Sequence, residues 1–359
     1  MKPTFLTRIV DNFLGRGPAA VTVPALDGAL KPNNRLEELE AGIAATSPDD
    51  LVLWERRLLW SDGAKLVSEQ GVVAEFGSEI TALAVAGDRL ALATIADGLL
   101  LLDGEFKRVA PSWSRPVKNV TALAAGPKGG IWFCTGSELR APDKWRRDLM
   151  ELNRSGLIGR ADPDTGEVRI VKRRLGYPSG IAVMPNGAIL YSEAWASHLV
   201  EMAADGATSR VVLDEIPGYP GRIRPRESGG YWLCVFAPRN PLIELVLREP
   251  GYRNAMMREI PEDLWVAPGY SSGRSFHEPM QGGALKQMGI LKPWAPTRSY
   301  GLVVELDASA SPLRSFHSRA GGRRHGITSA LEIDGMLWLA GRGSGEVLNM
   351  KPTPEGIMA

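Results

Sequence analysis

The chain has 359 residues, a formal net charge of +1, 44% hydrophobic residues and 40 glycines. A nucleic-acid-binding protein normally carries a clustered basic excess, so the balanced charge excludes nucleic acid as a partner. The length would suit two ordinary domains, but repeated segments cover most of it without a linker, so we predict one closed domain over residues 26–359.

Residues 1–25 are predicted to form a separate amphipathic extension. Apolar residues between Phe5 and Leu14 fall on one face of a short helix, with charged residues elsewhere. We expect this helix to dock on the main domain, and the alternative is a peripheral contact with a membrane surface. The sequence has no run of about 18 apolar residues and no secretory signal pattern at its N-terminus. We therefore expect a cytoplasmic protein.

One type of segment recurs six times along the chain. Each copy has a small or polar lead residue, alternating apolar residues, a turn with Gly or Asp, and a second apolar strand. The copies begin at Pro48, Ile80, Val120, Pro178, Pro220 and Ile327. This alternation is typical of a strand, a tight turn and a partner strand, as at Ile181, Val183, Ile189 and Tyr191.

Six such hairpins predict an all-β fold, a six-bladed β-propeller. A hairpin cannot bury both of its faces alone, but sheets of about four strands stacked radially around a channel can. Because a propeller closes its own edges, we expect a monomer. Cys134 and Cys234 each stand beside an aromatic residue on a second strand, and we predict that both are buried free thiols.

The spacing between copies widens before Ile327, where we predict a helical insert of about residues 240–295 between blades 5 and 6. Asn240 followed by Pro241 is a typical helix start, and a second helix is predicted over Tyr252 to Glu259. The insert is rich in apolar residues, which include Met256, Met257, Leu264 and Trp265. They are expected either to make the tunnel mouth apolar or to pack the helices on the blade edges.

Four stretches carry a resemblance to a known family. They are LDGALKPNNRLEELE, LGYPSGIAVMPNGAILYSEAWASHLVEM, IPGYPGRIRPRESGGYWLCVFAPRNPLIELVLREP and HGITSALEIDGMLWLAGRGSGEVLNM. From about Leu26 to Met350 the chain resembles the strictosidine synthase-like family, whose superfamily also contains gluconolactonases and paraoxonase-type calcium lactonases. The resemblance implies a six-bladed propeller with a helical lid over the tunnel.

In the calcium lactonases of that superfamily, four blades each supply a metal ligand at the start of the innermost strand. The corresponding positions here are Asp49 or Asp50, Thr121, Ser179 and Gly221. Only the first retains a carboxylate, whereas calcium takes 6–8 oxygen ligands, usually with several carboxylates. We therefore expect no cofactor, and calcium remains the alternative.

The resemblance to strictosidine synthase also implies a Glu near the start of the last blade, which would serve the condensation of an amine with an aldehyde. The matching stretch HGITSALE has His325, Thr328 and Ser329 there, and the next carboxylate is Glu332. The condensing Glu is therefore absent, and we do not expect this reaction. His325 and, in the insert, His277 are the acid–base candidates that remain.

Arginines gather in the same region of the sequence. They are Arg222, Arg224, Arg226, Arg239, Arg323 and Arg324. Because they occupy stretches that face the tunnel in the resembled family, we select Arg222 and Arg239 as tunnel residues that would bind an anionic ligand. Thr121, Ser179 and Thr328 are further substrate-binding positions. The alternative is that strand alternation turns about half of these arginines to solvent.

Two functions of different class follow from these observations. The first is a metal-independent small-molecule hydrolase of lactones or esters, with His325, Asp49 and Asp50 as catalytic candidates. The second is a non-catalytic propeller whose tunnel face binds an anionic or amphipathic metabolite or a protein partner. Two motif matches are set aside: GYSSG at 269–273 lacks the helix of a nucleophile elbow, and ADPDTGEV is predicted to be a hairpin turn.

Overall fold

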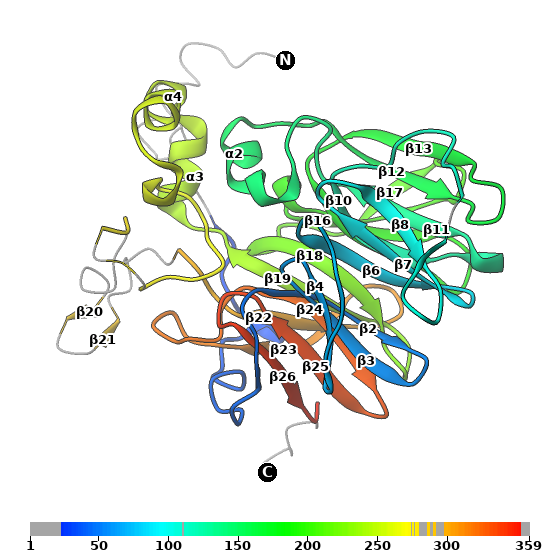
Figure 1. Cartoon of the computed structure of the whole chain (residues 1–359). Coiled ribbons are helices and arrows are strands. Elements are labelled where there is room, and N and C mark those ends of the chain that lie inside the picture. Colours follow the sequence, from blue (N-terminus) through cyan, green and yellow to red (C-terminus); the bar gives the residue numbers. More distant parts are fainter. Residues whose placement is uncertain are drawn as a thin grey trace.

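The computed structural model describes residues 23–109, 111–273, 275, 277–279, 286–287, 290–291 and 298–352. Within them, six sheets of four antiparallel strands stand side by side in a ring (Figure 1). The predicted six-bladed propeller is therefore confirmed. The predicted N-terminal helix lies outside the described residues.

The strands of each blade run from the innermost to the outermost. Blade 1 has β2 (Pro48–Trp54), β3 (Arg57–Asp62), β4 (Lys65–Ser68) and β5 (Gly71–Glu75). Blade 2 has β6 (Ile80–Ala86), β7 (Arg89–Thr94), β8 (Gly98–Leu102) and β9 (Arg108–Val109). Blade 3 has β10 (Val120–Ala125), β11 (Ile131–Thr135), β12 (Gly156–Ala161) and β13 (Val168–Leu175). The turn between β12 and β13 contains the ADPDTGEV segment, as predicted.

The other three blades follow the same order. Blade 4 has β14 (Pro178–Val183), β15 (Ile189–Glu193), β16 (His198–Met202) and β17 (Ser209–Leu213). Blade 5 has β18 (Gly218–Pro225), β19 (Tyr231–Pro238), β22 (Leu302–Leu306) and β23 (Pro312–His317). Blade 6 has β24 (Ile327–Ile333), β25 (Met336–Gly341), β26 (Glu346–Met350) and β1 (Ile43–Ala44).

Blade 6 is completed by a strand that precedes blade 1 in the sequence. β1 pairs antiparallel with β26, with Ile43 opposite Val347. The segment before β1 is held by Arg324, whose guanidinium donates to the backbone oxygens of Leu36, Leu39 and Glu40, among others. This closure was not predicted, because a strand of two residues carries no readable period.

Apolar side chains fill every interface between neighbouring blades. Six separate clusters of buried residues each join two adjacent blades around the ring. Cys134 and Cys234 are buried free thiols within two of these clusters, as predicted. The core of the propeller is therefore radial, and it leaves the centre of the ring to polar residues.

The helical insert leaves blade 5 after β19 and returns at β22, so it lies inside blade 5 and not between blades 5 and 6. α3 (Pro241–Arg248) and α4 (Pro250–Glu259) form where helices were predicted, and the Asn240 side chain accepts a hydrogen bond from the Leu242 N–H at 2.8 Å. The insert also holds η5 (Glu262–Leu264) and the short pair β20 (Lys286–Gln287) and β21 (Ile290–Leu291).

A further helix, α2 (Trp145–Met150), follows the short turn η3 (Pro142–Lys144) inside blade 3 and was not predicted. Figure 1 shows α2 close to α3 and α4 at the upper left. Met256 and Trp265 are buried against α2 and α3, which supports the alternative that the helices pack on the blade edges. The remaining short turns are η1 (Gly28–Leu30), η2 (Pro127–Gly129) and η4 (Ala194–Ala196).

Gly42→Ala should weaken the closure of the ring. A Cβ at Gly42 would lie 2.4 Å from the backbone oxygen of Val347, and its φ is not in the left-handed region, so the cost comes from the collision alone. We expect a loss of about 1–3 kcal/mol in the free energy of unfolding, measured by urea denaturation. Gly77→Ala is the matched control, because its Cβ would meet nothing within 4 Å. Equal stability of the two variants would contradict this account of the closure.

Candidate functional site

The second residue of every sequence copy lies at one level of the central tunnel. These six residues are Asp49, Thr81, Thr121, Ser179, Gly221 and Thr328, and they line one small central cavity of about 50 Å³. Arg222 lines the same cavity. The structure therefore brings together the predicted metal-type positions and three of the predicted substrate-binding positions with Arg222.

The hydroxyl groups at this level connect neighbouring blades. Each innermost strand has an irregular register at this point, a bulge that frees backbone groups from the ladder. The Thr121 hydroxyl donates to the backbone oxygen of Pro178 at 2.6 Å, and the Ser179 hydroxyl donates to that of Pro220 at 2.7 Å. Thr328 makes the same contact from blade 6 to blade 1. These hydroxyls are therefore used in holding the ring together.

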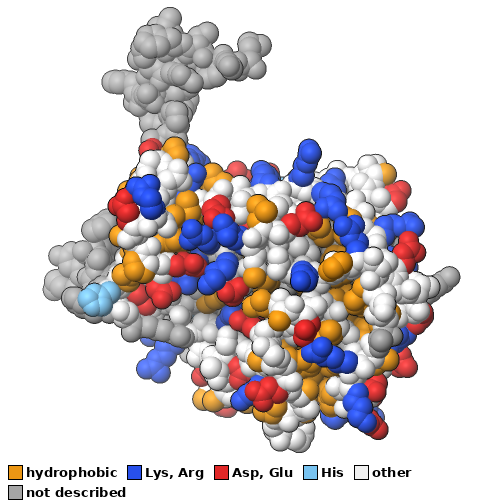
Figure 2. Space-filling view, turned by 45° about the horizontal axis from the view of Figure 1, so that its top comes forward, with side chains coloured by type: hydrophobic (Ala, Val, Ile, Leu, Met, Phe, Trp, Pro, Cys, Tyr) orange, Lys and Arg blue, Asp and Glu red, His pale blue; other side chains and the backbone are white. Residues whose placement is uncertain are grey.

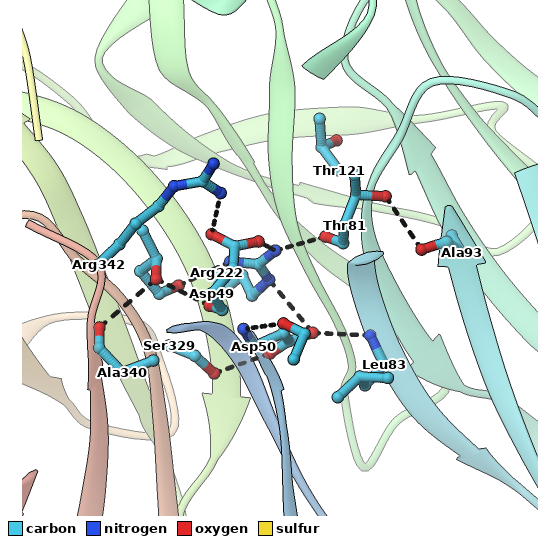
Figure 3. A network of polar contacts seen from close by, with 12 residues as sticks. Asp49, Asp50, Thr81, Leu83, Ala93, Thr121, Arg222, Ser329, Ala340 and Arg342 are labelled. Atoms are coloured by element: carbon cyan, nitrogen blue, oxygen red, sulfur yellow. Dashed lines mark hydrogen bonds and ion pairs between the residues drawn. The ribbon is translucent and has the colours of Figure 1, made fainter. Parts of the chain in front are cut away.

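Arg222 crosses the centre of the ring from blade 5 (Figure 3). Its Nη2 donates to Oδ2 of Asp49 at 2.6 Å and to the backbone oxygen of Thr81. Its Nη1 donates to the backbone oxygens of Asp49 and Thr328, both at 3.0 Å. One guanidinium group thus contacts blades 1, 2 and 6.

Arg224 makes a second crossing deeper in the tunnel. Its Nη2 donates to Oδ1 of Asp50 at 2.8 Å and to the backbone oxygen of Leu83, and its Nη1 donates to that of Leu123. Asp50 is fully buried and also accepts from the Leu83 N–H and the Ser329 hydroxyl. Both carboxylates that were predicted to be catalytic are therefore enclosed in hydrogen-bonded ion pairs.

Arg342 of blade 6 covers this network on the side of the tunnel mouth. Its Nη1 lies 3.0 Å from Oδ1 of Asp49, and its Nη2 lies 2.5 Å from Oε1 of Glu79. Burial alone would raise the pKa of Asp49, but the guanidinium groups of Arg222 and Arg342 outweigh it and hold that pKa below its usual value.

The charges at the centre of the tunnel balance. Among the described residues, the guanidinium groups of Arg222, Arg224 and Arg342 meet the carboxylates of Asp49, Asp50 and Glu79. An anionic ligand would have to displace one of these carboxylates, so the tunnel itself does not form the predicted anion site. The alternative that strand alternation turns about half of the six arginines to solvent does not hold for those on β18, because Arg222, Arg224 and Arg226 are spaced by two and share one face of the strand.

Arg239 and His325 do not line the tunnel cavity. Arg239 lies past the end of β19, where its Nε is 3.3 Å from Oε1 of Glu244, and it lines a separate cavity of about 560 Å³ beside residues 23–34. This position corrects its predicted tunnel role. His325 is 1% exposed, and burial lowers its pKa. Its Nδ1 lies 2.7 Å from Ser299 Oγ and its Nε2 lies 2.8 Å from the backbone oxygen of Arg319.

A wider cavity of about 780 Å³ lies above the tunnel, and we call it the vestibule. It shares Tyr270 and Arg342 with the tunnel cavity. Its walls come from α2, from η5 and from the loop that carries His277, and they include Trp145, Arg146, Asp263, Leu264, His277 and Arg298. The GYSSG segment is a loop in this wall, as predicted.

Aromatic rings pack beneath the vestibule. Trp145, Tyr177, Trp195, Tyr219, Phe236 and Tyr270 form a continuous cluster with centroid separations of 4.5–6.5 Å. Tyr177, Phe236 and Tyr270 line the tunnel cavity as well. The floor of the vestibule therefore combines aromatic faces with the guanidinium of Arg342.

Several site residues escaped the sequence analysis. Arg342 follows β25, and the end of a second strand lies beside the start of the first strand in any hairpin. That pairing could have identified Arg342, and Glu79 for the same reason, since it directly precedes β6. Tyr270 and Arg298 reach the site from the insert, whose path follows from tertiary packing and has no readable period.

Three further observations concern metal ligands, helix length and surface charge. The described part of the chain contains no group of three or more His, Cys, Asp or Glu side chains placed to hold a metal. It likewise contains no helix long and apolar enough to span a bilayer. On the face in Figure 2, basic and acidic side chains are interspersed, in agreement with the balanced net charge.

The chain is similar to several known proteins, and each match covers only part of the known protein's length. No protein family model matches. The adipocyte plasma membrane-associated protein of Salmo salar is 26% identical over 55% of this chain and 44% of its own length. That of Bos taurus is 29% identical over 62% of this chain and 49% of its own length. Strictosidine synthase-like 13 of Arabidopsis thaliana is 28% identical over 40% of this chain and 36% of its own. The chain thus spans about half, or less, of these relatives.

Solved structures show the same fold at low identity. A gluconolactonase from Xanthomonas campestris matches with a TM-score of 0.54 and 16% identity over 87% of this chain and 88% of its own. The calcium-binding protein regucalcin from Agrobacterium tumefaciens matches with a TM-score of 0.50 and 11% identity over 84% and 85%. The chain is a six-bladed propeller related to the strictosidine synthase-like and adipocyte plasma membrane-associated proteins, as its sequence motifs predicted.

Proposed function

We propose that this chain is a small-molecule-binding propeller that works without a metal and holds its ligand in the vestibule. The position of Arg222 carries the proposal. Its guanidinium supplies the positive charge at the level of the ring where the calcium lactonases of the superfamily would hold their ion. The tunnel below is sealed by ion pairs, so the space for a ligand is above it.

The donor set at the ring does not fit a calcium ion. Thr121 and Ser179 direct their hydroxyls at backbone oxygens of the next blade, and Gly221 has no side-chain donor. Asp49 is already paired with two guanidinium groups. Calcium needs 6–8 oxygens that converge on one point, and here those oxygens are occupied.

The vestibule has the size and composition of a ligand site. Its volume of about 780 Å³ lies in the usual range for small-molecule pockets, about 300–1,000 Å³. The rings of Trp145 and Tyr270, with centroids 5.1 Å apart, offer an apolar floor. Charged groups of both signs stand around that floor, so an amphipathic molecule matches the cavity best.

Leu264→Trp should block binding of small amphipathic compounds. Leu264 lines the vestibule and is 36% exposed, so a larger side chain can enter the cavity without disturbing the core. A panel of amphipathic compounds, screened by thermal shift and confirmed by calorimetry, should yield ligands whose affinity falls at least about tenfold in this variant. Val211→Trp, on the outer strand of blade 4, is the control and should bind normally.

Two outcomes would overturn this proposal. One is a rise in melting temperature with calcium, together with calcium-dependent turnover of a lactone. The other is equal binding by wild type and Leu264→Trp for every ligand found. Chelator alone should leave wild-type binding unchanged.

Asp49→Asn should reveal the ion pair at the centre of the ring. The folded-state pKa of Asp49 lies below the unfolded value of about 3.9, so the ionised carboxylate stabilises the fold above that pH. This stabilisation is lost as the pH falls through the folded pKa. At pH 7 the variant should be less stable by about 3–5 kcal/mol, as for a broken buried pair, and the difference should shrink below about pH 4.

The matched control is Asp88→Asn, whose side chain is 93% exposed. It should unfold like wild type across the same pH range in denaturant titrations. A stability difference for Asp49→Asn that stays constant from pH 7 to pH 3 would show that the carboxylate charge contributes nothing to the seal.

A metal-independent ester hydrolase is the second candidate, and one arrangement favours it. Oγ of Ser299 lies 2.7 Å from Nδ1 of His325 and 2.8 Å from Oγ of Ser272. The backbone oxygen of Arg319 can only accept, so Nε2 of His325 carries the ring proton and Nδ1 faces Ser299 as an acceptor. Ser272 lies next to Ser271, which lines the vestibule. In this geometry the Ser299 hydroxyl donates to Oγ of Ser272, so both hydroxyls must rotate before the proton of Ser272 passes through Ser299 to the imidazole.

A fluorophosphonate probe should label Ser272 if this second function operates. Labelling and aryl-ester turnover should both be lost in Ser272→Ala and fall strongly in His325→Gln, because the imidazole would accept the proton of the attacking hydroxyl. Ser309→Ala, at an exposed turn, should change neither readout. Absence of aryl-ester turnover in wild type would leave binding as the function, and turnover that persists in Ser272→Ala would refute the role of Ser272.

A further inference from the structure

Arg298 is the most unusual charged residue in the wall of the vestibule. Its side chain lines the cavity although the residue is only 5% exposed. Within the described part of the chain, the guanidinium has one hydrogen-bond acceptor, the backbone oxygen of Asp263 at 3.1 Å from Nη2. Its Nε is buried without a partner.

No carboxylate within the described residues lies within 4 Å of this guanidinium. Buried charges are normally paired, because the cost of removing them from water is several kcal/mol per ion. The tunnel arginines obey this rule, since Arg222, Arg224 and Arg342 each contact a carboxylate. Arg298 does not, so no carboxylate of the described residues neutralises it by direct contact.

Charges of both signs act on Arg298 from the wall of the vestibule. Burial lowers the pKa of Arg298, the positive charge of Arg146 lowers it further, and Glu278 and Asp263 oppose this only from a distance. Arg146 itself is weakly held, with Nε 3.9 Å from Glu262 and Nη2 3.5 Å from Asp263. An arginine remains charged throughout the physiological pH range. Arg298 and Arg146 thus place two guanidinium groups in the cavity wall. The carboxylates of Asp143, Asp263 and Glu278 also lie in that wall, but none of them contacts Arg298 within 4 Å.

Gly269 lets the guanidinium lie flat against the vestibule loop. A Cβ at Gly269 would be 3.3 Å from Nε of Arg298, and the Gly269 N–H donates to the backbone oxygen of Arg298 at 3.0 Å. Gly269 thus fixes the backbone of Arg298, and the hydrogen bond from Nη2 to the backbone oxygen of Asp263 fixes its side chain before any ligand arrives. A donor that is already in position loses little conformational entropy when it binds.

We propose that Arg298, assisted by Arg146, binds the anionic group of an amphipathic ligand whose apolar part rests on Trp145 and Tyr270. This inference rests on the proposed vestibule function and adds the chemical class of the ligand, a carboxylate or phosphate monoester. The planar guanidinium matches both groups and donates two parallel hydrogen bonds to them. The anion recognition that the sequence suggested for Arg222 and Arg239 is thereby assigned to two other arginines.

Calorimetry with matched probes tests the assignment. The probes are 3-phenylpropionate, its neutral amide 3-phenylpropionamide, and phenyl phosphate, with inorganic phosphate to separate the anion from the ring. Wild type should bind both aromatic anions more tightly than the amide. Because a hydrogen bond to a charged group contributes about 1.5–3 kcal/mol, Arg298→Gln should weaken anion binding about tenfold to a hundredfold and leave the amide unchanged.

Three further variants separate charge from structure. Arg298→Lys should restore part of the anion affinity, and Arg146→Gln should reduce it by a smaller factor. Arg169→Gln, whose side chain is 76% exposed on the outer strand of blade 3, is the control and should bind like wild type. Melting temperatures of all variants identify any that fail to fold. If a variant does not fold, the preference of the wild type for the anion over the amide decides whether the vestibule recognises an anionic group.

The outcomes distinguish this inference from the function on which it rests. If the amide binds as tightly as the carboxylate, and Leu264→Trp blocks both, the vestibule function stands and the role of Arg298 is refuted. If no probe or panel compound binds to folded wild type, both fail. A tighter complex with phenyl phosphate than with 3-phenylpropionate identifies the phosphate monoester as the natural class, and the reverse order identifies the carboxylate.

Discussion

Two guanidinium groups that cross the axis from blade 5 hold the centre of this propeller. Arg222 contacts blades 1, 2 and 6, and Arg224 contacts blades 1, 2 and 3. Apolar clusters join each blade only to its two neighbours, whereas these arginines join blades that do not touch. Buried cations are tolerated there because Asp49 and Asp50 neutralise them and backbone oxygens accept most of the remaining Nη protons, while Nε of each arginine has no hydrogen-bond partner among the described residues.

In this arrangement the tunnel holds the blades together, and a ligand would be bound elsewhere. The bulge in each innermost strand frees a backbone oxygen, and hydroxyls such as those of Thr121 and Ser179 bond to it across the interface between blades. The ring of polar residues is consequently a structural seal. In the proposed function the vestibule holds the ligand, and there Arg298 has no carboxylate partner among the described residues, unlike the arginines below it.

Much of the fold could be predicted from the sequence, because each blade repeats the same alternation and turn. The alignment of the six copies placed equivalent residues correctly, because the second residues of all six copies line one cavity. The partners of those residues were harder to predict. Arg222 was identified as a tunnel residue, but pairing across the ring depends on blades far apart in sequence, so its neutralisation by Asp49 was missed.

The insert shows the limit of the sequence pattern in another way. Helices α3 and α4 were predicted from caps and apolar residues, but the return of the chain into blade 5 at β22 was not. Arg239 was assigned to the tunnel because it occupies a stretch that faces the tunnel in the resembled family, but β19 carries it beyond the rim to the start of α3. The sequence did indicate that Arg222, Arg224 and Arg226 point to one face of their strand, because they are spaced by two residues.

The pairing of β1 with β26 makes the ring dependent on both ends of the described chain. During synthesis, blades 1 to 5 can form in order. Blade 6 is complete only when its last strand, β26, has been made and has paired with β1, which was made some 300 residues earlier. A contact between such distant segments forms slowly, because closing a long loop costs entropy before the contact repays it. Until then β26 is an open sheet edge, the kind of surface on which chains associate. The closing strand therefore protects the newly made protein from aggregation as well as stabilising the finished one.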